Sequence, residues 1–127
     1  MRILDLGCGR NYIASHFKEH SKIKVIGYDH VVENGSGARV GNILDLKEQE
    51  EDENTDICVY SQSLMGSDKM EYLQEGYRLL RYGGEMIISD SVSMLDDVQT
   101  KLQEIGMKIE GIEHDERRWF LLCARKC

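Results

Sequence analysis

Short apolar runs alternate along the chain with segments whose apolar residues recur every three or four positions. Runs of about 4–8 apolar or β-branched residues between turn residues indicate strands, and the longer period indicates helices with an apolar stripe. The pattern predicts strands over residues 2–6, 23–28, 38–41, 56–61, 85–89, 108–112 and 119–124. It predicts helices over residues 11–20, 68–81 and 94–105. Strands that alternate with helices in this way indicate βαβ units and a parallel sheet.

Two parts of the pattern modify this sheet. About ten residues separate the second strand from the third, which is too short for a crossover helix, so we expect a loop there. The last two strands flank a polar turn over residues 114–118, which predicts an antiparallel hairpin. The strand over 56–61 is apolar enough to be buried on both faces, and Gly83-Gly84 is expected to end the preceding helix. The predicted fold is α/β, with a mostly parallel Rossmann-like sheet, a C-terminal antiparallel hairpin and some helices missing.

Length and cysteine usage limit the classes of protein. We expect the 127 residues to form one domain over 1–127. No apolar run approaches the roughly 20 residues that a membrane-spanning helix needs. No charged-then-apolar export signal opens the chain, so we expect an intracellular protein. The cysteines, at positions 8, 58, 123 and 127, form no C-x-x-C pair, which argues against a zinc site.

The net charge is −7, and much of it comes from an acidic run over residues 47–56. We interpret this run as a solvated loop, with a docking surface for a basic partner as the alternative. Basic residues are few and local, so the charge is not typical of a domain that binds nucleic-acid phosphates by itself.

Gly7-Cys8-Gly9 follows the first strand and precedes the first helix. Glycines at such a turn let the backbone bend tightly and approach a ligand. Asp29 ends the second strand, 20 residues after Gly9, where an acid accepts hydrogen bonds from both hydroxyls of a ribose. The third glycine of the dinucleotide fingerprint is missing, which argues against NAD and FAD and favours a nucleoside without phosphate. Asp5, in the strand before the turn, favours a ligand that carries an ammonium and a sulfonium.

Residues that follow the third and fourth strands are expected at the carboxyl edge of the sheet, beside the glycine turn. Asp45 follows the third strand, and we expect it to accept from an adenine amino group while Leu44 or Leu46 packs on the ring. His30 is expected to line the same pocket. Residues 61–66 leave the fourth strand where, in this architecture, methyl donor and acceptor meet. The Asn/Asp-Pro-Pro-Tyr signature of amino-nitrogen methylation is absent from the sequence, as is a Pro-Cys nucleophile for pyrimidine C5.

The remaining histidines and aromatic residues receive structural interpretations. His16 and His20 are spaced i, i+4, but no third ligand is evident, so no metal site is predicted. Trp119, beside Phe120, is interpreted as packing the final strand rather than stacking on a base.

The segment Leu4-Asp5-Leu6-Gly7-Cys8-Gly9 resembles motif I of class I S-adenosylmethionine-dependent methyltransferases. A longer stretch, from Asp52 to Gly84, resembles the ribosomal RNA-processing protein 8 family, also called nucleomethylin. Its most specific motif is Ser63-Leu64-Met65-Gly66. The match continues to residues 120–122 and covers nearly the whole chain. The resemblance implies S-adenosylmethionine as cofactor, a nucleolar location and methylation of N1 of an adenine in large-subunit ribosomal RNA. It also implies that cofactor contacts fall on Gly7, Asp29, Asp45, Leu46 and Ser61.

Motif and resemblance together predict one cofactor site. Its members are Asp5, Gly7, Cys8, Gly9, Asp29, His30, Asp45, Leu46 and Ser61. No catalytic side chain is predicted, because a neutral ring nitrogen already has a lone pair and needs no base before it attacks a sulfonium methyl. Catalysis then rests on alignment and desolvation.

The chain departs from the family pattern in ways that leave alternatives open. Arg10 stands where the family has an acid, and Arg81-Tyr82 stands where it has Lys-Pro. Met1 is almost in the first strand, so we expect the segment that covers the cofactor in family members to be missing. One alternative is a methyltransferase for a small molecule or a protein, and another is a non-catalytic module that binds S-adenosylmethionine or chromatin partners. Ribosomal RNA as partner is expected to be reached directly or through a basic partner protein; no membrane partner and no oligomeric state are predicted.

Overall fold

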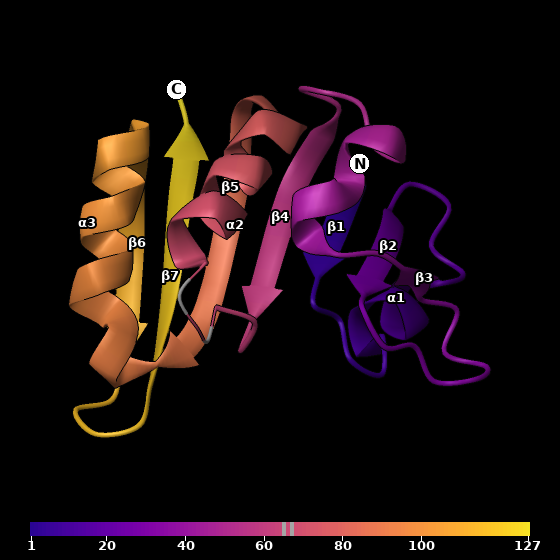
Figure 1. The fold of residues 1–127 in the computed structure, drawn as a ribbon, viewed down its shortest axis with the longest axis horizontal. Helices are drawn as coiled ribbons and strands as arrows, with labels where there is room; N and C mark the ends of the chain where they lie inside the picture. Colours follow the sequence, from indigo (N-terminus) through magenta and orange to yellow (C-terminus); the bar gives the residue numbers. More distant parts are fainter. Residues whose placement is uncertain (65, 67) are drawn as a thin grey trace.

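One mixed sheet runs through the molecule (Figure 1). A computed structural model describes residues 1–64, 66 and 68–127, and at residues 45 and 48 it describes the backbone alone. The strands lie in the order β3-β2-β1-β4-β5-β7-β6. The strands are β1 Arg2–Leu6, β2 Lys24–Asp29, β3 Arg39–Val40, β4 Thr55–Ser61, β5 Leu80–Ser91, β6 Met107–His114 and β7 Trp119–Lys126. The helices are α1 Tyr12–Phe17, η1 Ile43–Glu48, α2 Lys69–Leu79, η2 Val92–Met94 and α3 Leu95–Ile105.

The pairing of the strands confirms the predicted fold class. β1 to β5 run parallel to one another, while β7 runs antiparallel to both β5 and β6. The segment between β2 and β3 contains no helix, as the short spacing predicts. None of the described helices is long and apolar enough to cross a membrane.

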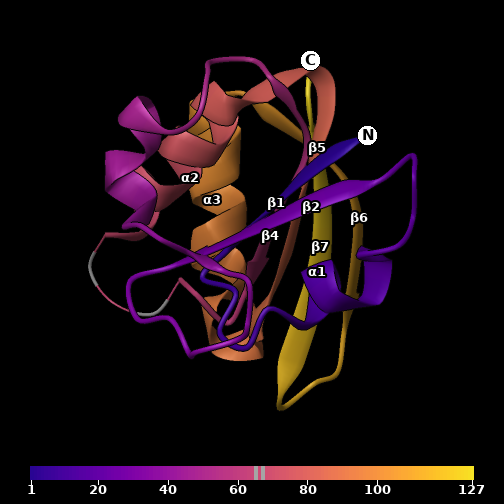
Figure 2. The same cartoon turned by 90° about the vertical axis from the view of Figure 1, so that its right-hand side faces the viewer.

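The two faces of the sheet are covered unequally. Helices η1, α2 and α3 lie on one face, and α1 lies on the other, beside β2 (Figure 2). The main core fills the space under α2 and α3, where Tyr60, Leu73 and Phe120 are fully buried. On the other face, Ile57 and Val59 of β4 are only half-buried. The prediction that this strand is buried on both faces is therefore wrong, because α1 is short and covers β2 rather than β4.

The bounds of two helices differ from the prediction. α1 has six residues, whereas the pattern predicts a helix over 11–20. α2 ends at Leu79, and Leu80 is already extended, with a ψ of 137°. The Gly83-Gly84 pair therefore lies inside β5 and does not end the helix. A Cβ on Gly84 would lie 3.0 Å from the backbone oxygen of Asp56, so this glycine allows β5 to approach the start of β4. The helix predicted over 94–105 is confirmed within one residue.

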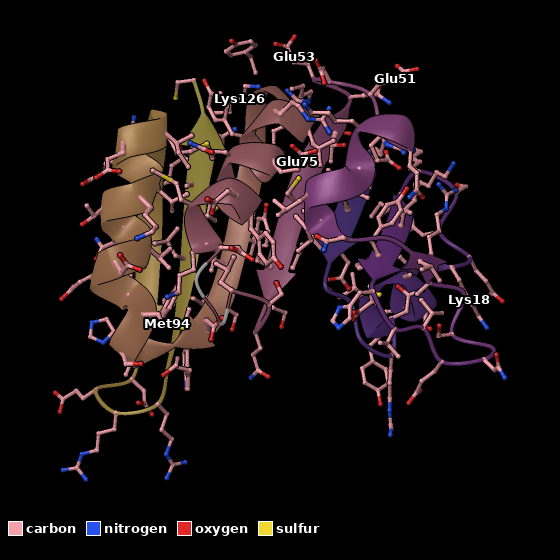
Figure 3. The ribbon with its side chains drawn as sticks, in the orientation of Figure 1. Lys18, Glu51, Glu53, Glu75, Met94 and Lys126 are labelled. Carbon is pink, nitrogen blue, oxygen red and sulfur yellow. The ribbon has the colours of Figure 1, made fainter. Side chains whose placement is uncertain are left out.

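The acidic run contains a buried carboxylate that the sequence interpretation misses. Glu50 is 4% exposed, and its carboxylate accepts hydrogen bonds from the Tyr28 hydroxyl and the Arg2 guanidinium. Burial and the hydrogen bond to Glu50 together raise the pKa of Tyr28. The neighbouring Glu51 is exposed and points outward (Figure 3). The run is thus not a uniformly solvated loop, since one acid ties the segment after η1 to β1 and β2.

Replacing Glu50 with alanine is expected to lower the free energy of unfolding by roughly 2–4 kcal/mol. The change leaves a buried tyrosine hydroxyl and a half-buried guanidinium without their shared acceptor. Chemical denaturation measures this loss. Glu51→Ala is the matched control and is expected to change the free energy by less than about 0.5 kcal/mol. Equal effects of the two substitutions would show that the Glu50 contacts do not hold the fold.

Candidate active site

A cleft opens at the carboxyl edge of the sheet, beside the point where the strand order changes direction between β1 and β4. Open α/β sheets bind ligands at such a switch point. The cleft has a volume of about 280 Å³, close to the lower end of the roughly 300–1,000 Å³ of small-molecule sites. It is lined by Gly7, Tyr28, Asp29, His30, Gly41, Asn42, Ile43, Gln62, Ser63 and Tyr72. The structure thus brings together residues that follow β1, β2, β3 and β4.

The turn after β1 depends on its glycines. Gly7 has a φ of 82° and Gly9 a φ of 54°, which L side chains rarely adopt. The backbone N–H groups of Gly7 and Cys8 both donate to the carbonyl of Tyr28. A Cβ on Gly7 would lie 2.6 Å from the Cβ of Ser63. Gly7 therefore lets the turn pack directly against the segment that follows β4, and only this glycine of the pair lines the cleft.

Asn11 supports this turn from the other side, and sequence reasoning misses it. The residue adopts the left-handed conformation with a φ of 63°, and its side chain is buried. Its Nδ2 donates to the backbone oxygen of Ser36 at 2.9 Å. A Cβ at Gly27 would lie 2.0 Å from the Asn11 Oδ1, so Asn11 fits only because β2 has a glycine there. The Asn11 side chain therefore joins the start of α1 to the loop after β2, in the space that Gly27 leaves open.

Asp29 connects the glycine turn to the end of β2. Its Oδ2 accepts from the N–H of Gly9 at 2.8 Å, and its Oδ1 accepts from the N–H of His30 at 2.8 Å. A carboxylate offers about four lone-pair directions. Two therefore remain for the hydroxyls of a ligand once the exposed His30 ring, whose Nδ1 lies 3.1 Å from Oδ1, turns away. The side chain of Asp29 is 16% exposed, whereas that of His30 is 81% exposed. The predicted ribose acceptor is therefore held rigidly at the wall of the cleft.

Asp5 and Cys8 lie behind the cleft and do not line it. Asp5 is 3% exposed, and its Oδ1 has no hydrogen-bond partner among the described residues. Burial first, and then the charge of Asp29, raise the pKa of Asp5 to about 6. Burial first, and then the charges of Asp5 and Asp29, raise the pKa of the Cys8 thiol to about 11. Cys8 therefore stays a thiol at neutral pH and is no nucleophile.

The other predicted contacts take different places. Leu46 is fully buried in the core and does not line the cleft, where Ile43 takes the apolar position. The side chain of Asp45 lies outside the described residues, as does Met65 of the Ser-Leu-Met-Gly segment. Ser61 is exposed at the end of β4, and the lining residues are the two that follow it. In the described part of the chain, no group of three His, Cys, Asp or Glu side chains is arranged to hold a metal.

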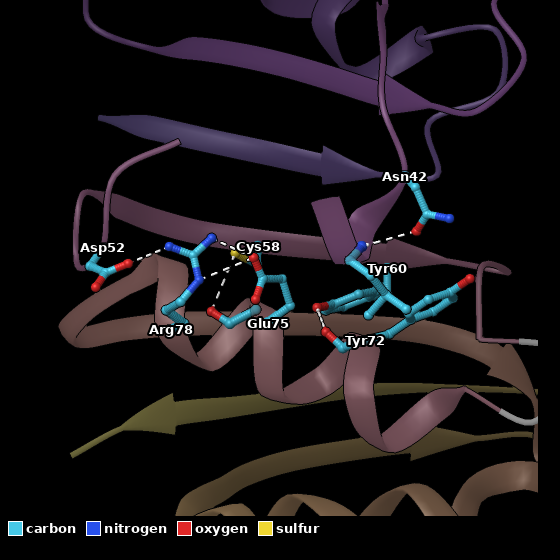
Figure 4. A network of polar contacts seen from close by, with 9 residues as sticks. Asn42, Asp52, Cys58, Tyr60, Tyr72, Glu75 and Arg78 are labelled. Atoms are coloured by element: carbon cyan, nitrogen blue, oxygen red, sulfur yellow. Dashed lines mark hydrogen bonds and ion pairs between the residues drawn. The ribbon is translucent and has the colours of Figure 1, made fainter. Parts of the chain in front are cut away.

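The structure adds Ser63 and Tyr72 to the site. Ser63 lines the cleft, and its Oγ is buried without a partner in the described part of the chain. Tyr72 lies in the first turns of α2, and its backbone oxygen accepts from the Tyr60 hydroxyl (Figure 4). A Cβ on Gly76 would lie 2.3 Å from that hydroxyl, so Gly76 lets α2 lie close to β4. Ser63 belongs to a motif of the sequence that gives it no particular role. Tyr72 has no neighbouring sequence signal that could identify it as a site residue.

The far end of α2 is fixed by charge. Arg78 binds the carboxylates of both Glu75 and Asp52 (Figure 4). This anchors α2 to the segment that precedes β4. Because α2 is held at both ends, Tyr72 keeps its place beside the cleft.

The fold is that of solved S-adenosylmethionine-dependent methyltransferases. A structure of an S-adenosylmethionine-dependent methyltransferase from Aquifex aeolicus superposes with a TM-score of 0.82 at 16% identity, over 100% of this chain and 82% of that chain. A family model described as "Hypothetical methyltransferase" matches residues 1–127, so the chain belongs to this methyltransferase family.

Curated relatives confirm the resemblance seen in the sequence. The 25S rRNA (adenine(645)-N(1))-methyltransferase of Schizosaccharomyces pombe is 29% identical over 98% of this chain and 40% of its own length. The ribosomal RNA-processing protein 8 of Caenorhabditis elegans is 32% identical over 91% of this chain and 32% of its own length. The chain thus spans less than half the length of either relative.

The buried carboxyl of Asp5 makes stability depend on pH. Its pKa rises on folding from 3.8 to about 6, so the folded state binds more protons between these values. The free energy of unfolding therefore falls as pH rises from about 4 to about 6, by up to roughly 3 kcal/mol. Asp5→Asn removes this loss and is expected to be more stable than the wild type at pH 7. Denaturation curves across this range measure the difference between the two proteins, and a difference that does not change with pH would contradict the prediction.

Proposed function

We propose that the chain binds S-adenosylmethionine in the cleft and transfers its methyl group to N1 of an adenine in ribosomal RNA. One observation carries the proposal. Asp29 binds the glycine turn through one carboxylate oxygen and keeps lone pairs free at the cleft wall. The same cleft reaches the residues that follow β4, so a nucleoside seated on Asp29 extends toward the end of that strand.

The residues of the cleft fit this cofactor. Asp29 has the free lone pairs that a ribose diol needs, and the unpartnered Ser63 Oγ is available to a polar group of the ligand. Asp5 and Asp29 place negative charge around the glycine turn. That charge suits a ligand with an ammonium and a sulfonium and opposes a pyrophosphate. Tyr28 and Ile43 supply apolar walls.

S-adenosylmethionine held by Asp29 and the glycine turn would supply a methyl group on a positively charged sulfur, and the sulfur would leave with the electron pair of the carbon–sulfur bond. The adenine N1 lone pair forms the new bond, so the positive charge moves to the base and no proton is removed first. Gln62, Ser63 and Tyr72 line this end of the cleft. Their work is to orient the acceptor and to exclude water.

Ribosomal RNA as acceptor is supported by the names of the relatives and by family membership. A nucleolar location follows from the same argument. The net charge of −7 supports a role for a basic partner protein, because an acidic domain binds a polyanion weakly.

Asp29→Asn is expected to weaken binding of S-adenosylmethionine by roughly 10- to 100-fold, since a charge-assisted hydrogen bond contributes about 1.5–3 kcal/mol. Asparagine keeps the size of the side chain but has one acceptor oxygen where two are needed. Isothermal titration calorimetry measures the affinity. The exposed Asp96 on α3 offers a matched control, and Asp96→Asn is expected to bind like the wild type. Equal affinity of Asp29→Asn and the wild type would reject this cofactor site.

Cells that lack the protein are expected to lose one N1-methyladenine from their large-subunit ribosomal RNA. Mass spectrometry of nucleosides from purified RNA measures the modification. Re-expression of the wild-type protein is expected to restore it, and Asp29→Asn is not. Ribosomal RNA that is unchanged in the deletion strain would exclude this acceptor and point to a small molecule or a protein instead.

A further inference from the structure

A second depression adjoins the cofactor cleft. It is lined by Gln62, Asp90, Ser91, Arg118 and Trp119 and has a volume of about 260 Å³. Gln62 lines both hollows. The two therefore meet at the end of β4, where the acceptor must reach the methyl group.

The turn between β6 and β7 forms the outer wall of this depression. The turn extends beyond the carboxyl ends of β4 and β5 (Figure 1). Asp115 Oδ1 accepts from the N–H groups of Arg117 at 2.7 Å and Arg118 at 2.6 Å. The carbonyl of Arg118 also accepts from Val92 at 3.0 Å. The backbone of the turn is thus fixed, while both arginine side chains are exposed.

The position of Trp119 differs from the sequence interpretation, in which it packs the final strand. Phe120 is fully buried in the core, but Trp119 is 45% exposed. Trp119 pairs with Ser91, the last residue of β5, which places its ring at the same sheet edge as the cofactor cleft. An exposed indole next to two guanidinium groups is the composition of a surface that stacks on bases and binds phosphates.

Gln62 has an unusual backbone. Its φ is 56°, and its N–H donates to the carbonyl of Ser89 at 2.7 Å. A non-glycine residue in this region is strained, and such strain persists mainly at functional sites. A glutamine amide pairs with N6 and N7 of adenine. That pairing leaves N1 of the same ring free.

From these observations we infer that the depression between Gln62 and Trp119 receives an unpaired nucleotide of the RNA substrate. The inference rests on the proposed function and gives its acceptor a site. Trp119 stacks on a base, the Gln62 amide reads the acceptor adenine, and Arg117 and Arg118 bind the adjoining phosphates. The base must be unpaired because an adenine inside a duplex cannot present N1.

The charge of the chain explains why this surface is small. The net charge of −7 repels a polyanion, so RNA contacts are expected where basic and aromatic side chains meet. Asp115 is engaged by the backbone of the turn, while Glu116 is exposed beside the arginines. Glu116 therefore opposes RNA binding at this turn, and its reversal to lysine is expected to strengthen it.

Fluorescence anisotropy with a labelled single-stranded RNA of about 12 nucleotides tests the site, because single-strand sites span about 4–16 nucleotides. The probe has one central adenine among uridines. Arg117→Ala/Arg118→Ala is expected to weaken binding and to reduce the slope of log affinity against log salt by about 1.4, or about 0.7 per phosphate contact. Trp119→Ala is expected to weaken binding about 5- to 100-fold, and Trp119→Phe is expected to recover most of the loss.

Three further variants separate a loss of RNA contacts from damage to the fold. Glu116→Lys is expected to tighten binding, which a damaged protein does not do. Lys18→Ala/Lys22→Ala removes two exposed charges and is expected to bind RNA like the wild type. Lys18 lies on the side of the molecule away from the turn (Figure 3), and Lys22 lies between α1 and β2. Gln62→Gly relieves the backbone strain, so it is expected to raise the unfolding temperature while it abolishes the preference for the adenine probe over an all-uridine probe.

The inference is overturned if the arginine and tryptophan variants bind the probe like the wild type, or if the lysine control loses as much affinity as they do. A wild-type chain that binds S-adenosylmethionine but no RNA would contradict both the surface and the proposed acceptor. A third outcome separates the two proposals. If the arginine and tryptophan variants lose RNA binding but the wild type methylates no RNA, the RNA-binding surface is supported and the proposed function alone is rejected.

Discussion

The carboxylate of Asp29 is the contact on which the site depends. It joins the N–H of Gly9 to the N–H of His30 and so fixes the glycine turn relative to the end of β2. Gly7 then packs against Ser63, which sets the distance between the nucleoside end of the cleft and the end of β4. This acid therefore shapes the turn, and in the proposed function it also accepts from the hydroxyls of a ribose.

The unequal covering of the sheet determines where chemistry can occur. α2 and α3 bury one face, and α2 is held there by Gly76, Arg78 and the Tyr60 hydroxyl. Among the residues that the structure describes, the opposite face carries only the short α1 beside β2, so β4 and β5 are half-exposed there. The carboxyl edge is shared by both faces. It carries the cleft proposed for the cofactor on one side of Gln62 and the depression under Trp119 on the other.

Features that depend on neighbouring residues in the sequence could be predicted. The glycine turn, the acid at the end of β2 and the C-terminal hairpin each leave a local signal, and the structure contains all three. Features that depend on distant partners could not. Glu50 is buried because Tyr28 and Arg2 lie far from it in the chain, and Tyr72 reaches the cleft only through the packing of α2.

The errors have the same origin. Leu80 continues the apolar period of α2 although it begins β5, because a strand and a helix accept the same leucine. Trp119 and Phe120 are both aromatic neighbours in one strand, yet the pleat sends one to the core and the other to solvent. Leu46 belongs to the core rather than to the cleft, since the short η1 turns it inward.

Reverse transcription of ribosomal RNA treated in vitro is the most direct measurement of the central claim, that the chain methylates N1 of an adenine. A methyl group on N1 blocks Watson–Crick pairing, whereas a methyl group on N6 still permits it. If the chain methylates N1, unmodified large-subunit RNA incubated with the protein and S-adenosylmethionine gains a strong stop next to one adenine, and the stop is absent without the cofactor. Methyl transfer into the RNA without any such stop would contradict it.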